Sequence, residues 1–455
     1  MHKTVFACSG LAALVLCGCT MIPHYERPPA PVPTTFPGGS DQSSLAADIR
    51  WRDFFTDPRL KRLVELSLAN NRNLRVAALT VEQYRAQYRI QFAELLPTVD
   101  AGGSYTRDRS FGHTSQEFTA NVGITSYEVD LFGRVRSLTG KALETYLASV
   151  ETHRSTEITL VAQVASEYLT LLDDQEQLDL AQQTLVSVQR SYDLNKLEFD
   201  KGTLDQLDLS TAEGQVHSAQ VSILEYQRLV AQAINYLTLL VGEQLPTDLP
   251  AGQTLVGQGT FTNLPAGLSS DLIERRPDIL SAEHTLLAAN ANIGAARAAF
   301  FPVVTLTGSG GYTSVQLSQL FTPASMAWSF EPQISFPIFN GGSNLATLDY
   351  AEVTKRLEVA NYEKAIQTAF REVADALVAR DRYTSELTAQ EKLVASEQKR
   401  YDLSNQLYRE GLGSYLSVLT AQQDLYSAQS ELITTRTNRL GNLITLYESL
   451  GGGWN

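Results

Sequence analysis

The amino-acid sequence contains one pattern twice, and this duplication limits the possible fold more than any other feature. Five pairs of segments match in the same order, at offsets of 205 to 209 residues. The pairs are Glu94–Val99 with Ala299–Val304, Asp130–Arg134 with Pro337–Gly341, Ser191–Gly202 with Arg400–Gly411, Leu207–Gln215 with Leu416–Asp424, and Leu239–Gly242 with Glu448–Gly451. Two copies are too few for a solenoid, in which three or more short repeats stack. We therefore expect one large structure that is built twice.

Each half has the same order of predicted elements. A helical segment ends before a proline, two strand-like segments follow, and then come a very long helix, a glycine break and a second helix. The predicted divisions are a signal peptide (1–18), a proline-rich tether (19–50), a first repeat (51–242), a linker or equatorial segment (243–267), a second repeat (268–451) and a C-terminal tail (452–455).

The absence of proline from long stretches predicts very long helices. No proline lies between Pro97 and Pro246, and none follows Pro337. Val135–Leu197 and Leu345–Glu410 are also rich in Ala, Leu, Gln, Glu and Arg, which favour helix. At 1.5 Å per residue each helix would be roughly 95–100 Å long, against ~40–45 Å for a whole bilayer. These helices are therefore expected to project through water.

The long helices carry a 4-3 spacing that is typical of a coiled-coil seam. The first seam is Val164, Tyr168, Leu171, Gln175, Leu178, Gln182, Leu185, Gln189 and Tyr192. The second is Val373, Leu377, Arg380, Thr384, Leu387, Glu391, Val394, Gln398 and Tyr401. A plain helical-bundle core is one interpretation. The many polar members favour the other, a helical wall with packed flanks and one wet side.

Four segments alternate between apolar and polar residues, as barrel strands in an outer membrane do. A half-buried sheet of a soluble protein is the alternative. A membrane barrel needs at least 8 strands, and an open edge in lipid leaves backbone groups unsatisfied. Four strands can close only if several chains contribute, and three chains would supply 12. The segments are Val99–Arg107, Phe118–Thr125, Val303–Thr313 and Met326–Ile338, with hairpin loops expected at Asp108–Glu117 and Ser314–Ser325.

The N-terminus resembles a bacterial lipoprotein signal. Lys3 precedes an apolar run, Val5–Leu16, that is too short to span a bilayer. Leu16-Cys17-Gly18-Cys19 then predicts cleavage after Gly18 and a lipid on Cys19. Because Thr20 rather than Asp follows, the expected address is the outer membrane. An ordinary signal with incidental cysteines and a CxC metal pair are the alternatives.

Composition argues against several other classes of protein. The formal charge is −14, and removing Lys3 with the signal makes it −14 − 1 = −15, which does not suit nucleic-acid binding. The mature histidines are scattered and show no metal-ligand spacing. No catalytic constellation is present, so we expect neither an enzyme, nor a metal, nor any cofactor besides the lipid on Cys19. The mature segments contain no run of 18 apolar residues.

Several motifs together resemble the outer-membrane factors of tripartite efflux pumps, in the OprM/NodT branch of the TolC-like superfamily. These motifs are the lipobox with "PHYERPPAPVP", "WRDFFTDPRLKRLVELSLANNRNLR" (Trp51–Arg75), "RRPDILSAEH" (Arg275–His284), "PIFNGG" (Pro337–Gly342) and "LGGGW" (Leu450–Trp454). The resemblance covers essentially the whole mature chain. It implies a homotrimer with a 12-stranded barrel and a periplasmic helical tunnel. It also implies a periplasmic adaptor and an inner-membrane pump, often of the resistance-nodulation-division type, with passive export of drugs or other small molecules.

The resemblance also implies a periplasmic gate at the two helical turns. These turns are Phe199–Leu209 and Tyr408–Leu419. Relatives line the constriction with a leucine and an aspartate one turn apart, and Leu416 and Thr420 occupy these places here. The aspartate is thus replaced, which argues against an acidic gate of the usual form.

Further residues near the two turns complete the candidate gate. Leu207 and Thr211 are the equivalents in the first half. Asp205, Asp208 and Asp424 are nearby acids that could substitute for the missing aspartate, although a solvated surface charge is the favoured interpretation of each one singly. Gly202, Gly411 and Gly413 are expected in the turns, and Arg409 and Glu410 are candidates for adaptor docking.

Two functions of different class follow from these features. The first is the passive exit duct of an efflux or secretion machine. The second is a periplasmic coiled-coil structural lipoprotein without a pore. The four alternating segments favour the duct, because a scaffold has no need of barrel strands.

Overall fold

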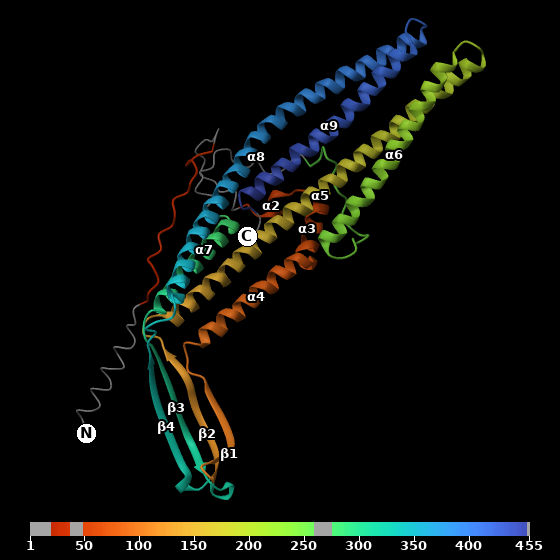
Figure 1. Ribbon diagram of the computed structural model, residues 1–455. Coiled ribbons are helices and arrows are strands. Elements are labelled where there is room, and N and C mark those ends of the chain that lie inside the picture. The colour runs from red at the N-terminus through yellow and green to blue at the C-terminus, as the bar shows by residue number, and fades with distance from the viewer. Residues whose placement is uncertain (1–19, 37–48, 259–274, 453–455) are drawn as a thin grey trace. The chain divides into compact units, whose positions relative to one another are not determined.

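The computed structural model describes residues 20–36, 49–258 and 275–452 (Figure 1). The contacts within the chain divide it into two compact units. One unit, the sheet unit, takes its described residues from 20–30, 79–151 and 280–365. The other, the helical unit, takes them from 31–36, 49–78, 152–258, 275–279 and 366–452. Each unit therefore draws on both halves of the sequence. The signal peptide, Cys19, part of the predicted linker and most of the tail lie outside the described residues.

Most equivalent elements of the two halves have nearly equal lengths, although β2 has 17 residues and β4 only 10. Helices α4 and α7 each have 22 residues, α5 and α8 each have 67, and β1 and β3 each have 12. The elements are α2 (Trp51–Phe54), α3 (Pro58–Asn70), α4 (Arg72–Ala93), β1 (Val99–Ser110), β2 (His113–Val129), α5 (Arg134–Asp200), α6 (Gln206–Val241), α7 (Pro277–Ala298), β3 (Val303–Ser314), the 3₁₀ turns η3 (Leu317–Gln319) and η4 (Pro323–Ser325), β4 (Met326–Ser335), α8 (Ser343–Arg409) and α9 (Tyr415–Ser449).

The four strands form one antiparallel sheet in the order β1-β2-β3-β4, with an apolar and a polar face. The register places Val122 of β2 between Ala101 of β1 and Gly310 of β3. Gly310 in turn pairs with Trp328 of β4, whose side chain is 81% exposed. The exposed large apolar residues of this face are Val99, Tyr105, Val122, Tyr312, Met326, Trp328, Phe330 and Ile334. The opposite face is polar.

Hydroxyl pairs across strands mark the polar face. Ser104 and Thr119 are hydrogen-bonded at 2.8 Å, and Ser309 and Ser329 at 2.9 Å. Because side chains alternate along a strand, the alternation read from the sequence becomes two chemically distinct faces once the register aligns the four strands.

The link between β1 and β2 is shorter than expected. The sequence suggested a loop over Asp108–Glu117, but the pairing continues to Ser110 and His113. The turn is made by Phe111 and Gly112, whose φ angles are 50° and 84°. A two-residue turn with both φ values positive matches the twist of antiparallel strands, so the strands can pair to their ends. The loop prediction was therefore wrong for this hairpin, because the sequence lacks the Asn-Gly or Asp-Gly pair that usually marks it.

A bulge in β2 changes which residues face the apolar side. The register shifts between Ile124 and Tyr127, and Ser126 has a φ of 52°. Tyr127 then pairs with Leu306 on the apolar face, while Glu128 joins the polar face. The bulge thus turns a carboxylate toward the start of the next helix.

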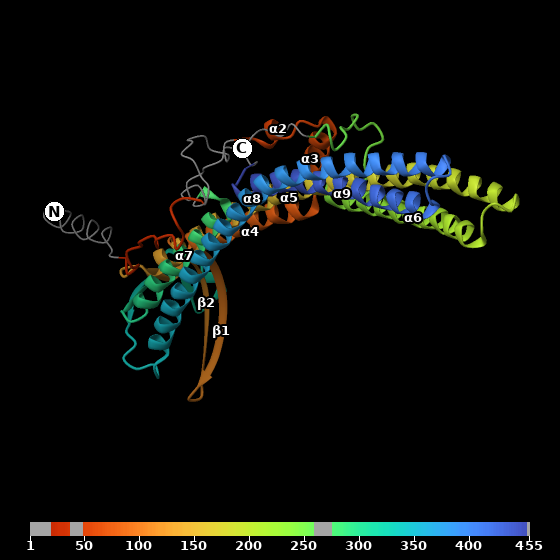
Figure 2. The ribbon, with the colours of Figure 1, turned by 90° about the horizontal axis from the view of Figure 1, so that it is seen from above.

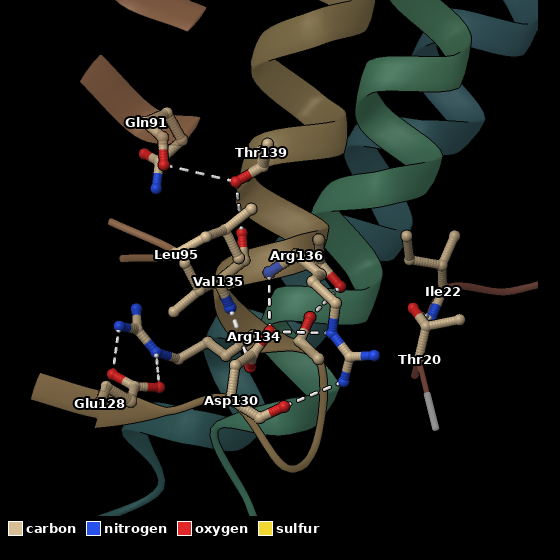
Figure 3. A network of polar contacts seen from close by, with 12 residues as sticks. Thr20, Ile22, Gln91, Leu95, Glu128, Asp130, Arg134, Val135, Arg136 and Thr139 are labelled. Carbon is tan, nitrogen blue, oxygen red and sulfur yellow. Dashed lines mark hydrogen bonds and ion pairs between the residues drawn. The ribbon is translucent and has the colours of Figure 1, made fainter. Parts of the chain in front are cut away.

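Two carboxylates fasten the end of β2 to the start of α5 (Figure 3). Glu128 accepts two hydrogen bonds from Arg134, at 2.8 and 2.6 Å. Asp130 accepts the backbone N–H of Val135 at 3.1 Å and that of Arg136 at 2.8 Å, together with the Arg136 side chain. A carboxylate at a helix N-terminus satisfies free N–H groups and favours the helix dipole. Asp130 and Arg134 belong to the duplicated "DLFGR" motif, which therefore acts as a junction between strand and helix.

The long helices pack as two hairpins, α5 with α6 and α8 with α9 (Figures 1 and 2). On the distal part of α5 the buried positions recur every seven residues, at Asp174, Ala181, Val188 and Asn195. The seam suggested from the sequence was displaced here, since Gln182 is exposed. Small or polar residues such as Ala181 and Asn195 are buried here, whereas the predicted seam residues Leu178 and Leu185 are only partly buried. Neighbouring helices can approach most closely where side chains are small. Thr384 and Glu391 on α8 are exposed, so one side of these helices is polar in the single chain.

Asp57 organises the polar core of the helical unit. Its side chain is fully buried and accepts the N–H groups of Arg59 and Leu60 at the start of α3. It also accepts the Tyr168 hydroxyl of α5 at 2.9 Å, the Gln253 N–H at 2.9 Å and the side chain of Gln258. One carboxylate therefore joins α3, α5 and the segment after α6, which explains why a charge can be buried there.

The motifs at the two ends of the chain meet in the same unit. Phe54 of "WRDFF" stacks on Tyr447 with ring centroids 4.1 Å apart, and the Tyr447 hydroxyl donates to the carbonyl of Ile49. Near the end of α9, the Ser449 carbonyl accepts from Arg276 of "RRPD". Arg276 also pairs with Asp278 and Glu372.

The first half has an equivalent of this helix end. Ser67 and Asn71 both donate to the Leu240 carbonyl at the end of α6, at 2.7 Å each. Leu240 and Ser449 are equivalent positions of the two repeats. The last carbonyls of α6 and α9 are thus both satisfied by residues that precede α4 and α7. Among the described residues, no helix is long and apolar enough to cross a membrane.

Candidate gate at the hairpin tips

The two hairpin tips are built by the same backbone turn. Five residues separate α5 from α6, and five separate α8 from α9. The Thr203 N–H donates to the Glu198 carbonyl at 3.0 Å, and the Leu412 N–H donates to the Leu407 carbonyl at 2.9 Å. Gly202 and Gly411 adopt φ angles of 76° and 71°. This is the Schellman arrangement, in which glycine reverses the chain and satisfies the last carbonyls of a helix.

Gly413 has a different reason to be glycine. It is not among the described glycines with positive φ. A Cβ atom at Gly413 would lie 3.2 Å from the Leu407 Cβ and 3.3 Å from the Tyr408 nitrogen. Close packing of the turn on the end of α8, rather than backbone conformation, thus favours glycine at this position.

An exposed leucine follows each turn. Leu207 is 74% exposed and Leu416 is 65% exposed, on the first turns of α6 and α9. Each is followed one helical turn later by a threonine. Thr211 donates its hydroxyl to the Leu207 carbonyl at 2.7 Å, and Thr420 donates to the Leu416 carbonyl at 2.9 Å. The hydroxyl protons are thereby used within the helix, and the pair presents an apolar side chain and a methyl group.

The three nearby acids lie in different surroundings. Asp205 caps α6 by accepting the Asp208 N–H at 2.9 Å, as Ser414 caps α9 through the Ser417 N–H. Asp208 is only partly exposed. Asp424 lies one turn beyond Thr420 and forms an ion pair with Arg400 of α8, whose Nη2 also lies 3.4 Å from the Thr420 carbonyl. Asp205 is therefore part of a cap, and Asp424 carries a charge that Arg400 neutralises.

Arg400 was not among the residues selected from the sequence. It lies 12 residues before Leu412, and Asp424 lies 12 residues after it. Residues equally far from the turn of a helical hairpin face each other, so this count could have identified the pair. The equivalents in the first repeat are Ser191 and Gln215, which carry no charge. The ion pair therefore distinguishes the α8–α9 hairpin from the α5–α6 hairpin.

A polar network joins the two hairpins. Tyr408 of α8 donates its hydroxyl to Glu198 of α5 at 3.2 Å, and burial together with Glu198 raises the pKa of Tyr408 to about 12. The phenol therefore remains a hydrogen-bond donor at neutral pH. Ser187 of α5 contacts the Tyr401 hydroxyl at 3.3 Å and accepts from Gln422 of α9 at 3.1 Å. These contacts between the hairpins are hydrogen bonds between polar side chains.

The candidate docking residues lie at the second tip. Arg409 ends α8 and is exposed, and the exposed Glu410 accepts a hydrogen bond from Gln406 at 3.0 Å. Nothing at the tips resembles a catalytic site. In the part of the chain that the structure describes, no group of three or more His, Cys, Asp or Glu residues is placed to hold a metal ion.

Comparison with known proteins shows the family. The model of the outer membrane efflux protein family matches residues 63–243 and again 268–452. The chain belongs to the outer membrane efflux protein family. It is therefore a channel protein rather than an enzyme, and the family does not favour the alternative of a scaffold without a pore.

Relatives match over nearly the whole length of this family member. A probable efflux pump outer membrane protein of Pseudomonas putida, TtgC, is 47% identical over 458 residues, covering 98% of this chain and 94% of TtgC. The cation efflux system protein CusC of Escherichia coli is 40% identical and covers 97% of each chain. The open state of the Neisseria gonorrhoeae MtrE outer membrane channel superimposes with a TM-score of 0.89 at 39% identity, covering 96% of this chain and 99% of MtrE. The expected fold, long helices with four strands per chain, is confirmed.

Proposed function

We propose that three copies of this chain form the outer-membrane exit duct of a tripartite efflux pump. The observation that carries the proposal is the four-stranded sheet with one apolar and one polar face. Within one chain β1 and β4 are each paired on one side alone. Their free N–H and C=O groups are costly in lipid, and four strands are too few to close a barrel. Four strands from each of three copies make 12, which closes the sheet.

The partners and cargo follow from the relatives. Relatives are named as the outer membrane proteins of an antibiotic efflux pump and of a toluene efflux pump. We propose that this chain likewise receives drugs or other small organic molecules from an inner-membrane pump, of the resistance-nodulation-division type, through a periplasmic adaptor. We propose that passage through the duct is passive, in keeping with its membership of the outer membrane efflux protein family.

The assembly is tested by electrophoresis of the detergent-extracted protein without heating. We expect a band at about three times the mass of the 50.0 kDa chain, which heating converts to the monomer. Backbone pairing of strands between the copies explains why the trimer resists detergent until it is heated. A protein that remains monomeric before heating would contradict the exit duct.

We propose that Leu207 and Leu416 close the duct at its periplasmic end. Exposure of both leucines on equivalent helix starts supports this, since each copy would contribute two apolar side chains to a ring. Thr211 and Thr420 then line the duct one helical turn beyond the leucines. The Arg400–Asp424 ion pair holds α8 against α9 one turn farther on. Hydrophobic constrictions of this kind restrict ions by excluding water.

Truncation of the gate residue tests this placement. Leu416→Ala is expected to raise single-channel conductance about twofold or more, because a ring of shorter side chains leaves a wider opening that water can enter. Leu412→Ala is the matched control, since Leu412 is also exposed, at 74%, but lies in the turn. Equal conductance of the two variants would place the constriction elsewhere.

We also propose that Cys19 carries a lipid after cleavage of the signal. The lipobox supports this, together with residues 20–36, which the structure describes as extended chain with no helix and a single β-bridge at Thr35. Mass spectrometry of the purified N-terminus tests it. An unmodified cysteine, or a mature start at another residue, would exclude the lipid anchor.

A further inference from the structure

The segment that follows Cys19 runs along one face of α7. Three residues of α7 contact it, Glu283, Asn290 and Gly294, and the intervals of seven and four residues place them on the same side of the helix. The contacts span Ile22 to Arg27 and lie within the sheet unit. This site was not predicted from the sequence, in which "RRPDILSAEH" was only one of the motifs that carry the family resemblance.

Gly294 provides a notch for the backbone of the segment. A Cβ atom at Gly294 would lie 2.7 Å from Cγ1 of Ile22 and 2.9 Å from its backbone nitrogen. It would also lie 2.6 Å from the Ser137 hydroxyl on the first turn of α5. Distances below 3 Å are too short for a carbon atom, so a side chain here would displace Ile22. Figure 3 shows Ile22 beside the first turn of α5.

Two buried polar side chains of α7 recognise the rest of the segment. Asn290 is 2% exposed and donates to the Pro23 carbonyl at 2.9 Å. Glu283 is 9% exposed and accepts from Arg27 at both oxygens, at 2.8 and 2.6 Å. Tyr25 also donates to Glu283, at 3.1 Å. A bidentate arginine on a largely buried carboxylate is a strong and directional contact.

We propose that Glu283, Asn290 and Gly294 form a clasp, a binding site on α7 for residues 22–27 of the same chain. When residues 22–27 are bound to the clasp, Thr20 is held near the end of the sheet at which α5 begins. If the chain is the proposed lipoprotein duct, this end is the periplasmic boundary of the barrel, and the clasp fixes the lipid attachment point there. Residues 22–27 of the tether are then a bound element rather than part of a free linker.

The clasp can be tested by cleavage of the purified full-length protein. Chymotrypsin cuts after Tyr25 only when the segment leaves α7, and N-terminal sequencing identifies the cut. We expect Glu283→Gln and Gly294→Ala each to accelerate this cleavage about tenfold. The first change removes the charged acceptor of Arg27, and the second fills the notch that holds Ile22. Gly140→Ala is the matched control, since a Cβ atom on this helical glycine of the same unit would meet only Ala291 at an ordinary 3.8 Å.

A third variant changes the segment itself, so that a folding defect caused by the substitutions on α7 can be recognised. Arg27→Gln changes a side chain that is 47% exposed and is expected to accelerate cleavage like Glu283→Gln. Unchanged cleavage in all three variants, or rapid cleavage of the unaltered protein, would overturn the clasp. The unheated electrophoretic band of each sample separates this result from the proposed function, because the clasp lies within one chain and the duct requires three.

Discussion

At the scale of the residue, buried polar groups determine much of this protein. Asp57 is buried with its hydrogen-bond acceptors occupied, so its charge is compensated. Asp174 on α5 is also buried, at 7% exposure, but it lies beside Asp173. Burial, and then Asp173, raise the pKa of Asp174 to about 6, while Arg228 acts in the opposite direction. The two aspartates thus illustrate a satisfied and a costly buried charge.

The Asp174 carboxylate predicts a pH-dependent stability. Its folded-state pKa lies above the ordinary value of 3.8, so the ionised form costs stability near neutral pH. This cost is relieved as the pH falls through about 6 toward 4. Asp174→Asn should therefore stabilise the protein at about pH 7.5, by at most about 3 kcal/mol, and by only about half as much at about pH 5. Melting temperatures in detergent at the two pH values measure the difference.

Asp179→Asn on the exposed side of α5 is the control, and little change is expected at either pH. An equal gain from Asp174→Asn at both pH values would show that the carboxylate is not responsible.

At the scale of the element, glycines and caps decide where the long helices end. Proline-free sequence allows 67 residues of helix in α5 and again in α8, but does not itself stop them. Gly202 and Gly411 supply the left-handed residue, and Asp205 and Ser414 cap the returning helices. The helix–turn–helix order of both tips was therefore readable from the sequence.

Substitution at a tip glycine should be measurable as a loss of stability. Gly411→Ala forces an alanine into a left-handed conformation and is expected to cost about 1–2 kcal/mol. Gly214→Ala lies within α6 with no other atom within 4 Å of the added carbon, and should instead stabilise by up to ~1 kcal/mol. Melting temperatures of the two variants should move in opposite directions. A stabilising Gly411→Ala would contradict the turn described here.

At the scale of the whole molecule, the two faces of the sheet explain why one chain is incomplete. Trp328 and its neighbours form an apolar face that one chain leaves uncovered, while Ser309 and Ser329 mark a polar face. Edge strands and an apolar face together require lipid on one side and further strands on both edges. The sheet is therefore the element that links this fold to a membrane and to other copies.

Arginine substitutions on β4 test which face meets lipid. Trp328→Arg is expected to cost about 2–4 kcal/mol if its side chain reaches the bilayer midplane. Ser329→Arg, one residue away on the polar face, should be tolerated because that face lines water. The fraction of protein in the unheated trimer band measures both effects. Loss of the trimer with Ser329→Arg but not with Trp328→Arg would reverse the assignment of the faces.

The sequence by itself determined the periodic features of this protein. Proline-free runs, alternating strands, the duplicated motifs and the tip glycines all depend on local backbone chemistry, which neighbouring residues reveal. Tertiary structure decided the contacts between distant segments. The two-residue turn at Phe111, the bulge after Ile124 and the displaced seam at Ala181 depend on how strands and helices align. The notch at Gly294 depends on a segment more than 260 residues away. Such contacts have no local signal, because their energy comes from partners that only the folded chain brings together.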